Sequence, residues 1–572
     1  MTEKEQTRPW PHKQTAIMKT NINIKFACMA ILATLSLQPF TLRSQVGVVP
    51  YQPQHSAPVL PPGAPPALSP AQGNSQGRGN TDCDGDKNRQ GANAWLLTGN
   101  ASSVAGSNFL GTTDNRPLEI KVNSQRAFRL EPNTNGAPNV IAGSSANFVA
   151  PGTVGAVIGG GGSLKYDAGN GLKAWSNNIY ANFSSIGGGL ANYILTGADY
   201  GTVAGGWDNL ILSNSQAAVV AGGFVNIIRD NSQESTIGGG QDNWIYDHSR
   251  YSTIAGGDFN RIEGQSWEAS FSGGGGNDIQ SFSSGSLIAG GAGNTIGTNV
   301  LDSAISGGLQ NLIAPQSIYA TIGGGDHNTA LANNATVAGG GVNSAANSYA
   351  AVGGGLGNTA AGFYATIPGG VYNAANGNDS FAAGRRAKAN YDGSFVWADS
   401  SDVDFAATAA NQFTARCTGG AAFVTAIDGA GNATAGVMVP PGSGSWSTLS
   451  DRSAKEEFHA VDVKEVLDRL VAVPISNWNY KTQDKSIRHL GPMAQDFRAA
   501  FHIGEDDKHI STVDEEGVAL AAIQGLNQKV EEQTIQLQQK EEAIHELNKS
   551  VAELKKLVSA LSQRVDLKTI QP

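Results

Sequence analysis

Cysteine is almost absent from this chain of 572 residues, which contains only Cys28, Cys83 and Cys417. Their spacing does not match a metal site, and without Cys28, which lies in a segment expected to be removed, two are too few for a disulfide framework. Basic residues are also scarce, because charged residues make up 15% of the chain and the net charge is −10. This balance lacks the basic surface that nucleic-acid binding requires. We therefore expect no nucleic-acid partner, no metal, no cofactor, and a fold that relies on packing.

Long hydrophobic runs are missing too, apart from one stretch at residues 26–37. Lys19 and Lys25 precede it and small or polar residues around Ser44 follow it, which is typical of an export signal. The stretch is short for a membrane span, so we favour export over a membrane anchor.

Two segments follow from this interpretation. Residues 1–45 are predicted to be a signal or export segment, with Met1 or Met18 as the start. Residues 46–90 are predicted to be a linker, because they are rich in Pro and Gly. We expect the mature chain to have no membrane span and to be secreted or held at the cell surface.

Glycine, in contrast, is abundant, with 73 residues, and many of these glycines belong to an internal repeat. An asparagine recurs at a 17-residue interval and then at a 15-residue interval, at positions 192, 209, 226, 243, 260, 277, 294, 311 and 328, and then at 343, 358 and 373. A Gly-Gly pair lies three and four residues before each asparagine. Six residues before each one lies a large apolar residue: Ile186, Val203, Val220, Ile237, Ile254, Phe271, Ile288, Ile305, Ile322, Val337, Val352 and Ile367.

Repeats of this length predict a solenoid, whose units bury their apolar side chains only by stacking. Glycine allows a corner with positive φ or a close approach of the next coil, and asparagine can adopt a left-handed turn or stack its amide. Twelve coils at about 4.8 Å each give a rod roughly 58 Å long. We predict a mainly β protein, with a Gly-rich parallel β-solenoid (β-roll) over 151–400, a small β domain over 91–150 and a β neck over 401–449.

The last repeats have a different pattern. Ser380-Phe-Ala-Ala-Gly-Arg-Arg-Ala387, followed by Gly393-Ser-Phe-Val-Trp397, resembles the head repeats of trimeric surface adhesins. Those head repeats are usually shorter than the longer repeats of this chain, which leaves open whether three chains share one core.

Carboxylates also occur in the repeats. Asp208, Asp242, Asp258 and Glu263 lie near the predicted coil corners, where two of them could pair as glycosidase acids. The sequence singles out no pair, and solubilising surface carboxylates are the alternative. We therefore predict no turnover enzyme in the part that precedes residue 450, which we call the passenger.

Ser450 and Lys455 lie five residues apart in Leu449-Ser-Asp-Arg-Ser-Ala-Lys455. A serine hydroxyl becomes a good nucleophile when a base takes its proton, and lysine acts as that base only when it is neutral. Keeping a lysine mostly neutral near pH 7 requires its pKa to fall by roughly 3 to 4 units from about 10.4, through burial or a like charge. The alternative is a capped turn, with Ser450 beside Asp451 and Lys455 solvated.

The block from Leu449 to Leu526 also contains Arg488-His-Leu-Gly-Pro-Met-Ala-Gln-Asp-Phe497. It resembles the intramolecular chaperone auto-processing domain at the C-terminus of phage endosialidase tailspikes. The resemblance implies a trimer that helps an elongated β-structured passenger to assemble and then cuts itself off with a serine-lysine dyad. It places the cut between Leu449 and Ser450, with Ser450 and Lys455 as the catalytic residues. His489 is a further candidate for orienting the dyad.

The predicted chaperone domain, residues 450–522, is a small α/β unit. Asp462 followed by Glu465 indicates a helix N-terminus before apolar residues at helical spacing. Pro474 ends that helix, residues 475–480 alternate as a strand does, and residues 493–501 are predicted to form a short helix.

Heptads over residues 523–566 predict a C-terminal coiled coil. The a positions are Ile523, Val530, Leu537, Ile544, Val551, Val558 and Val565, and the d positions are Leu526, Gln533, Lys540, Leu547, Leu554 and Leu561. The polar Gln533 and Lys540 are candidates for setting the register or the number of helices. A mostly β-branched a layer with Leu at d favours a dimer, whereas the family resemblance favours a trimer, which we adopt.

These features together predict an exported homotrimeric fibre or adhesin-like protein. Its chaperone domain drives assembly and then acts once per chain as a self-cleaving serine peptidase. The surface partner is expected to be a cell-surface glycan or another part of a host surface. The alternatives are a phage-type tail fibre with a glycan-binding or glycan-processing passenger, and a trimeric autotransporter-like adhesin without a recognisable barrel anchor.

Overall fold

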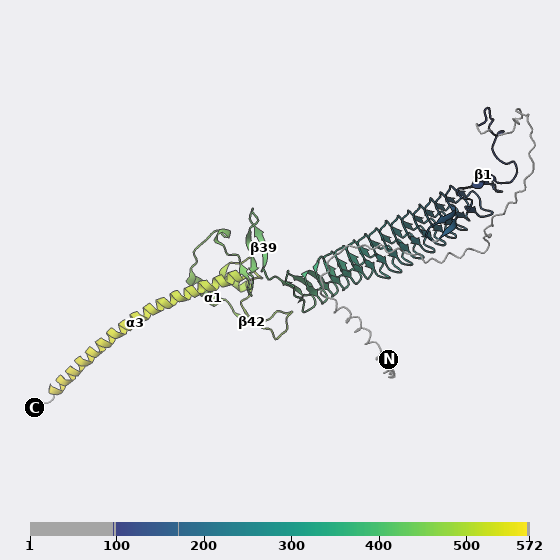
Figure 1. Ribbon diagram of the computed structural model, residues 1–572. Coiled ribbons are helices and arrows are strands. Elements are labelled where there is room, and N and C mark those ends of the chain that lie inside the picture. The colour runs from purple at the N-terminus through teal and green to yellow at the C-terminus, as the bar shows by residue number, and fades with distance from the viewer. Residues whose placement is uncertain (1–94, 96–98, 170, 569–572) are drawn as a thin grey trace, which may run out of the picture. The chain divides into compact units, whose positions relative to one another are not determined.

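The computed structural model describes residues 95, 99–169 and 171–568, nearly all of them within one unit, Asn100–Pro572. The predicted signal segment 1–45 and linker 46–90 lie outside the described residues. None of the helices in the described part of the chain combines the length and apolar character needed to cross a bilayer. The described elements are mainly short parallel strands, followed by a small antiparallel sheet and helices (Figure 1).

The parallel strands form a β-solenoid with two ladders, in which each strand pairs with the equivalent strand of the next coil. The first ladder contains β3 (Asn139–Ala142), β5 (Val157–Ile158), β9 (Ser185–Ile186), β11 (Thr202–Val203), β13 (Val219–Val220), β15 (Thr236–Ile237), β17 (Thr253–Ile254), β19 (Ser270–Phe271), β21 (Leu287–Ile288), β23 (Ala304–Ile305), β25 (Thr321–Ile322), β27 (Thr336–Val337), β29 (Ala351–Val352), β31 (Thr366–Ile367), β32 (Gly370–Val371), β34 (Phe381–Arg385), β36 (Phe395–Ala398) and β38 (Phe413–Arg416).

The second ladder is a 16-stranded parallel sheet. It contains β4 (Phe148–Val149), β8 (Asn178–Ile179), β10 (Tyr193–Ile194), β12 (Leu210–Ile211), β14 (Ile227–Ile228), β16 (Trp244–Ile245), β18 (Arg261–Ile262), β20 (Asp278–Ile279), β22 (Thr295–Ile296), β24 (Leu312–Ile313), β26 (Thr329–Ala330), β28 (Ser344–Ala345), β30 (Thr359–Ala360), β33 (Ala374–Ala375), β35 (Ala387–Ala389) and β37 (Phe405–Ala406).

The register of the ladders confirms the two repeat lengths. Val203 pairs with Val220, which is the equivalent position of the next 17-residue coil, and Thr329 pairs with Ser344, which is the equivalent position of the next 15-residue coil. The solenoid has more coils than the twelve predicted from the asparagines, because irregular coils extend it at both ends. Near its start, the hairpin of β6 (Ser163–Asp167) and β7 (Leu172–Trp175) interrupts the period.

Two apolar columns fill the inside of the coils, and a single chain encloses both. The predicted column is confirmed, since residues such as Val203 and Ile254 are fully buried. A second buried column, two residues after each asparagine, was missed although it has the same period. Its members are Ile194, Ile211, Ile228, Ile245, Ile262, Ile279, Ile296 and Ile313, and then Ala330, Ala345, Ala360 and Ala375.

The repeated asparagines form a buried ladder along the solenoid. The backbone N–H of Asn209 donates to Oδ1 of Asn192 at 3.1 Å, and its Nδ2 donates to the same oxygen at 3.2 Å. The same Nδ2 also reaches the carbonyl oxygens of Gly205 and Gly223, each at 3.0 Å. Each amide thus stacks on the next coil, which is one of the two predicted roles. The left-handed conformation falls instead on the preceding residue, as at Asp208 with φ 57°.

The second glycine of each pair lies where two coils touch. Gly206 has φ +90°, and a Cβ built there would lie 2.2 Å from the carbonyl oxygen of Gly223. Both predicted reasons for glycine, a positive φ and a close approach of the next coil, therefore apply at this position.

The 17- and 15-residue coils differ by one corner. Besides the glycine pair, the coil after Asn209 has positive φ at Asn214, Ala217 and Val225. A 15-residue coil such as 343–358 has positive φ, besides its glycine pair, at Tyr349 and Gly357. Loss of a corner narrows the coil, which explains why the second apolar column changes from Ile to Ala where the repeat shortens.

The described residues on either side of the solenoid form antiparallel structure. Before it, β1 (Leu118–Val122) pairs with β2 (Gln125–Glu131), which pairs with β3. After it, β39 (Ala421–Ile427), β40 (Ala433–Val439) and β41 (Ser447–Thr448) form a three-stranded sheet. The remaining elements are the 3-10 turn η1 (Arg452–Ala454), α1 (Val463–Ala472), the hairpin of β42 (Ser476–Trp478) and β43 (His489–Gly491), α2 (Ala494–Phe501) and the long helix α3 (Thr512–Lys568).

Candidate active site

A capped turn brings Ser450 and Lys455 together. The carboxylate of Asp451 accepts a hydrogen bond from the backbone N–H of Ser453 at 2.8 Å and starts the 3-10 turn. Hydrogen bonds from the backbone and side chain of Ser453 lower the pKa of Asp451. The turn ends at Lys455, whose extended backbone (φ −130°, ψ 153°) sends its side chain back toward the start of the turn. Asp451 alone provides the cap, which leaves the hydroxyl of Ser450 available.

The dyad residues are in direct contact. Nζ of Lys455 donates a hydrogen bond to Oγ of Ser450 at 2.7 Å. Both residues are exposed in the single chain. The geometry for proton transfer is therefore present, while the burial that would favour a neutral lysine is not provided by one chain alone.

The peptide bond between Leu449 and Ser450 is held on both sides. The backbone N–H of Leu449 donates to the carbonyl oxygen of Gly436 in β40 at 3.2 Å, which continues the pairing of β41. On the other side, Asp451 fixes the start of η1. Gly436 has φ +151°, and a Cβ there would lie 2.4 Å from the carbonyl oxygen of Phe423. Asp451 was expected only in the alternative of a capped turn, and no role was predicted for Gly436.

His489 belongs to an aromatic cluster on the hairpin of β42 and β43. Its Nε2 lies 2.8 Å from Oε1 of Gln483, and its ring lies 4.7 Å from Trp478 and 5.6 Å from Tyr480, between centroids. The hydrogen bond of its ring is thus with Gln483 and not with Ser450 or Lys455. An auxiliary role for His489 stays a prediction.

The first helix of this region begins where the sequence predicts. The carboxylate of Asp462 accepts hydrogen bonds from the backbone N–H groups of Lys464 and Glu465 at 3.0 and 3.1 Å, which confirms the cap. The side chain of Glu465 does not close a capping box, because it pairs with Arg469 one turn later.

Helix α1 packs closely against α3. A Cβ built at Gly525 would lie 2.2 Å from the carbonyl oxygen of Val463, so glycine is what lets the helices approach. Two ion pairs, Lys464 with Glu532 and Lys529 with Asp468, join the same helices. The small buried core of this region lies here and under α2.

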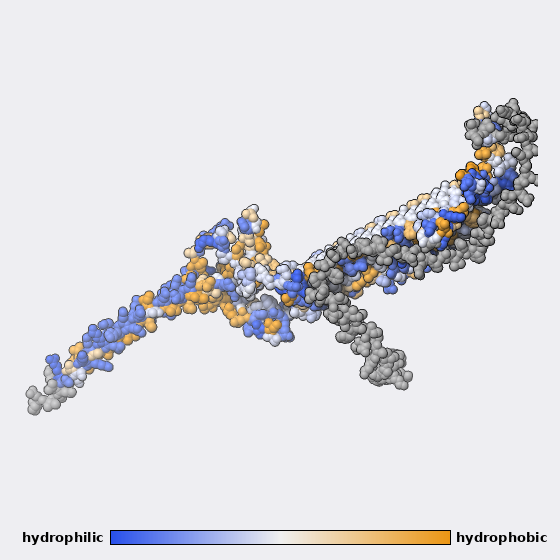
Figure 2. All heavy atoms as spheres, viewed as in Figure 1, coloured by the Kyte–Doolittle hydropathy of each residue, from blue (hydrophilic) through white to orange (hydrophobic). Residues whose placement is uncertain are grey.

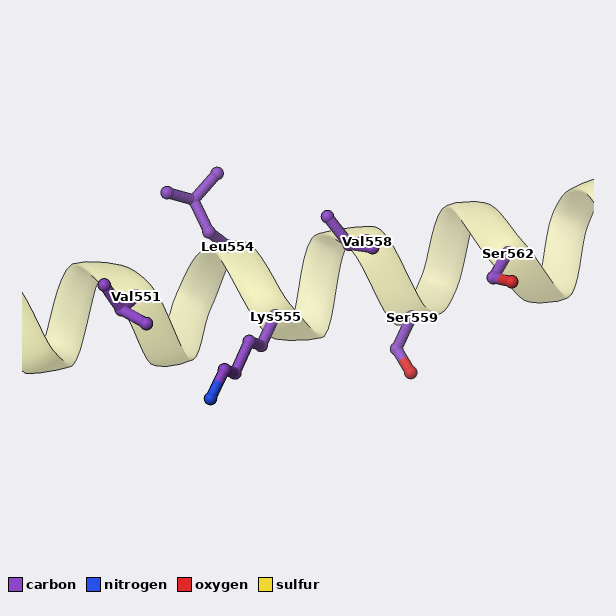
Figure 3. Close-up of a pocket in the computed structure, with 6 residues that line it drawn as sticks. All are labelled: Val551, Leu554, Lys555, Val558, Ser559 and Ser562. Atoms are coloured by element: carbon purple, nitrogen blue, oxygen red, sulfur yellow. The ribbon is translucent and has the colours of Figure 1, made fainter.

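Most of the heptad residues of α3 are exposed. The apolar a and d residues from Ile523 to Leu561 are 40–65% exposed. Orange apolar atoms recur along the helix in Figure 2. In Figure 3, Leu554 and Val558 project from one side of α3, and Lys555 and Ser559 project from the other. A mostly apolar seam thus runs along α3 from Ile523 to Leu561, and no other element of the described part of the chain covers it.

The structure also singles out a carboxylate on the outer face of the second ladder. Asp278 lies one coil after Arg261 and near Glu263. Burial, together with the charge of Glu263, raises the pKa of Asp278 to about 6. Asp278 was not among the carboxylates predicted from the sequence. Of those, Glu263 lies near Asp278, and Asp242 accepts a hydrogen bond from Nε1 of Trp244 at 2.5 Å. Within the described residues, no group of three or more His, Cys, Asp or Glu side chains is arranged to hold a metal ion.

Comparison with known families identifies the segment that contains the dyad. Residues 450–502 match the family model described as chaperone of endosialidase. No curated protein shows a significant match to the chain. The family match begins at Ser450, and a parallel β-solenoid precedes it. Residues 450–502 are therefore similar to the chaperone-of-endosialidase family, and this segment together with the β-solenoid before it fits a tailspike- or endosialidase-like fibre.

Proposed function

We propose that the C-terminal part of the chain assembles three copies of the passenger and then cuts itself off between Leu449 and Ser450. The observation that supports this most directly is the 2.7 Å contact between Nζ of Lys455 and Oγ of Ser450, at the start of the matched segment. The passenger is then released as an exported, fibre-like trimer.

The chemistry follows from the two residues. Neutral Lys455 takes the proton of the Ser450 hydroxyl, and Oγ attacks the carbonyl carbon of Leu449. The bond between that carbon and the nitrogen of Ser450 breaks, the nitrogen gains a proton to become an amine, and an ester links the two residues. Water then hydrolyses the ester, which frees the hydroxyl of Ser450 and leaves a carboxylate on Leu449. Each chain reacts once.

Assembly provides the switch. Ser450 and Lys455 are exposed in a single chain. Contact with other copies would bury both side chains, and burial favours the neutral form that a lysine needs to act as a base, so that cutting follows assembly. The uncovered seam of α3 supplies the surface on which copies associate, and the family match favours three of them.

A passenger built from repeats would benefit from a C-terminal domain that aligns the copies before the coils stack. Within the 17-residue coils, a slip by one repeat places each buried Ile or Val on another and each asparagine on another asparagine. Such registers are nearly equal in energy. Association of the copies through α3 would align their C-terminal ends and so select one register before the coils stack.

Replacement of the dyad tests the mechanism. Wild-type protein should separate into residues 1–449 and 450–572, whereas Ser450→Ala should stay intact. Lys455→Arg should also stay intact, because a guanidinium does not act as a neutral base. Ser443→Ala, which changes an exposed serine outside the turn, should cut as the wild type does. The readout is intact mass, and cleavage of Ser450→Ala at the wild-type rate would rule out the mechanism.

A further inference from the structure

The three-stranded sheet β39–β41 ends at the predicted cut. Cleavage after Leu449 would leave this whole sheet on the passenger and remove α3 with its seam. A released passenger that remains associated must therefore hold together through surfaces of its own, and this sheet is its last structured element.

Both faces of the sheet expose apolar side chains, including Val424 and Met438 on one face, and the other face also carries a pair of aromatic rings. Phe423 pairs with Val437, and Val437 pairs with Thr448, so these side chains share a face. Trp446 joins them, with its ring 5.7 Å from that of Phe423. Phe423 is 57% exposed and Trp446 is 58% exposed. Such a surface is unfavourable in water unless another surface covers it.

The same face has a composition that fits a copy of itself. The strands Ala421–Ile427 and Ala433–Val439 contain no charged side chain. Figure 2 shows pale and orange atoms where Figure 1 labels β39. A partner with a charged surface would have to remove water from its charged groups on contact with these strands, and no ion pair would compensate for that cost. Copies aligned by α3 would instead bring identical apolar faces to the same level.

We propose that the face formed by Phe423, Val437 and Trp446, here called the collar face, packs against the collar faces of the other copies and holds the released passengers together at the cut end. This inference rests on the proposed self-cleavage, because it concerns the product. The backbone of Leu449 is tied to the same sheet through Gly436. Packing of the collar faces would therefore also steady the bond that is cut.

The two faces of β39 give a matched pair of variants. Val424 lies next to Phe423 on the same strand, is 52% exposed, and pairs with Gly436 on the opposite face. Phe423→Glu places a charge on the collar face, whereas Val424→Glu places it on the other face. Trp446→Glu, at the edge of the collar face, provides a second change with less effect on the strands.

The experiment compares the masses of the products by analytical ultracentrifugation of full-length protein after self-cleavage. Fragment 1–449 from wild type and from Val424→Glu should sediment as a trimer. The same fragment from Phe423→Glu and from Trp446→Glu should sediment as a monomer. Each change placed in the uncut Ser450→Ala protein should leave the trimer intact, because α3 remains attached.

The outcomes separate this inference from the proposed function. A trimeric 1–449 fragment from both Phe423→Glu and Trp446→Glu would overturn the proposed packing between collar faces. A monomeric fragment from Val424→Glu as well would overturn the assignment to one face. If circular dichroism shows that Phe423→Glu does not fold into a solenoid, the mass of the fragment from Trp446→Glu alone decides whether the collar faces hold the fragments together. Cleavage of Ser450→Ala would instead refute the proposed function itself.

Discussion

The solenoid and the region after it bury their apolar side chains in opposite ways. In the solenoid, Ile and Val side chains of both columns are fully enclosed by one chain. In the described residues from 450 onward, only Val473, Phe497, Val518 and Ala522 are buried hydrophobic residues. The solenoid thus has a core of its own, whereas α3 and the collar face expose apolar side chains that the proposed contact with other copies would cover. The part that needs partners is the part that is predicted to bring the copies together.

The largest effect is expected from charge in the seam of α3. Leu547→Asp combined with Leu554→Asp should prevent association, because burying unpaired carboxylates costs several kcal/mol, which is at least about a hundredfold in the dissociation constant. Cleavage should be lost with it if Lys455 is buried only in the assembly. Sedimentation and intact mass measure the two effects.

The matched control for the seam is Lys556→Asp with Ser559→Asp. These residues lie away from the a and d positions of the same stretch of α3. This variant should associate and cut like the wild type. If the seam variant also cuts normally as a monomer, the link between assembly and cleavage is wrong.

A smaller effect is expected inside the solenoid, where one chain is enough. Ile262→Ala leaves a cavity in a 17-residue coil and should cost about 2–5 kcal/mol. Ala360→Ile overfills a 15-residue coil and should cost about 1–3 kcal/mol. Thr253→Ala, at the outward position of β17, should have little effect. The melting midpoint of the uncut Ser450→Ala protein, at a fixed heating rate, measures all three.

This series tests the explanation for the change from Ile to Ala. If Ala360→Ile melts at or above the unmodified protein, the 15-residue coils are not narrower inside. The comparison between the two kinds of coil would then need another cause.

The smallest effect should come from Asp278 on the solenoid surface. Its pKa is raised from 3.8 to about 6, so the unfolded chain loses the proton first as the pH rises. Stability should therefore fall between about pH 4 and pH 6 and then level off. Asp278→Asn should remove this fall and gain about 1 kcal/mol at pH 7.5, after allowance for solvent that reaches the group. Glu234→Gln, which changes an exposed carboxylate just before β15, should not change the profile. Equal pH profiles for wild type and Asp278→Asn would refute the effect.

The sequence predicts the solenoid well because its signal is repeated. The two repeat lengths, the first apolar column and the role of the second glycine all appear in the structure. The column that starts at Ile194 shares that period but was not predicted, because only the residues before each asparagine were interpreted as core positions. The inserted hairpin β6–β7 occurs once, so no period could reveal it.

The sequence predicts less of the candidate site than of the solenoid. The spacing of Ser450 and Lys455 shows two compatible residue types, and the structure adds their contact at 2.7 Å. The role of Asp451 as the sole cap depends on backbone geometry, and that of Gly436 depends on a strand pairing distant in sequence. The proposed burial of Lys455 would depend on contact between several chains, so it cannot be read from one sequence or from one chain.

The asparagine ladder has a consequence for how such a protein changes over evolutionary time. Each amide contacts only the coils directly before and after it, and every regular coil presents the same groups to its neighbours. A duplication or deletion of one whole 17-residue coil in the gene would leave every remaining contact satisfied. It would change the length of the rod by about 4.8 Å. An insertion that does not make up a whole coil would have to be looped out, as the β6–β7 hairpin is. The reach of the fibre can therefore drift in fixed steps, while the machinery at its C-terminal end stays the same.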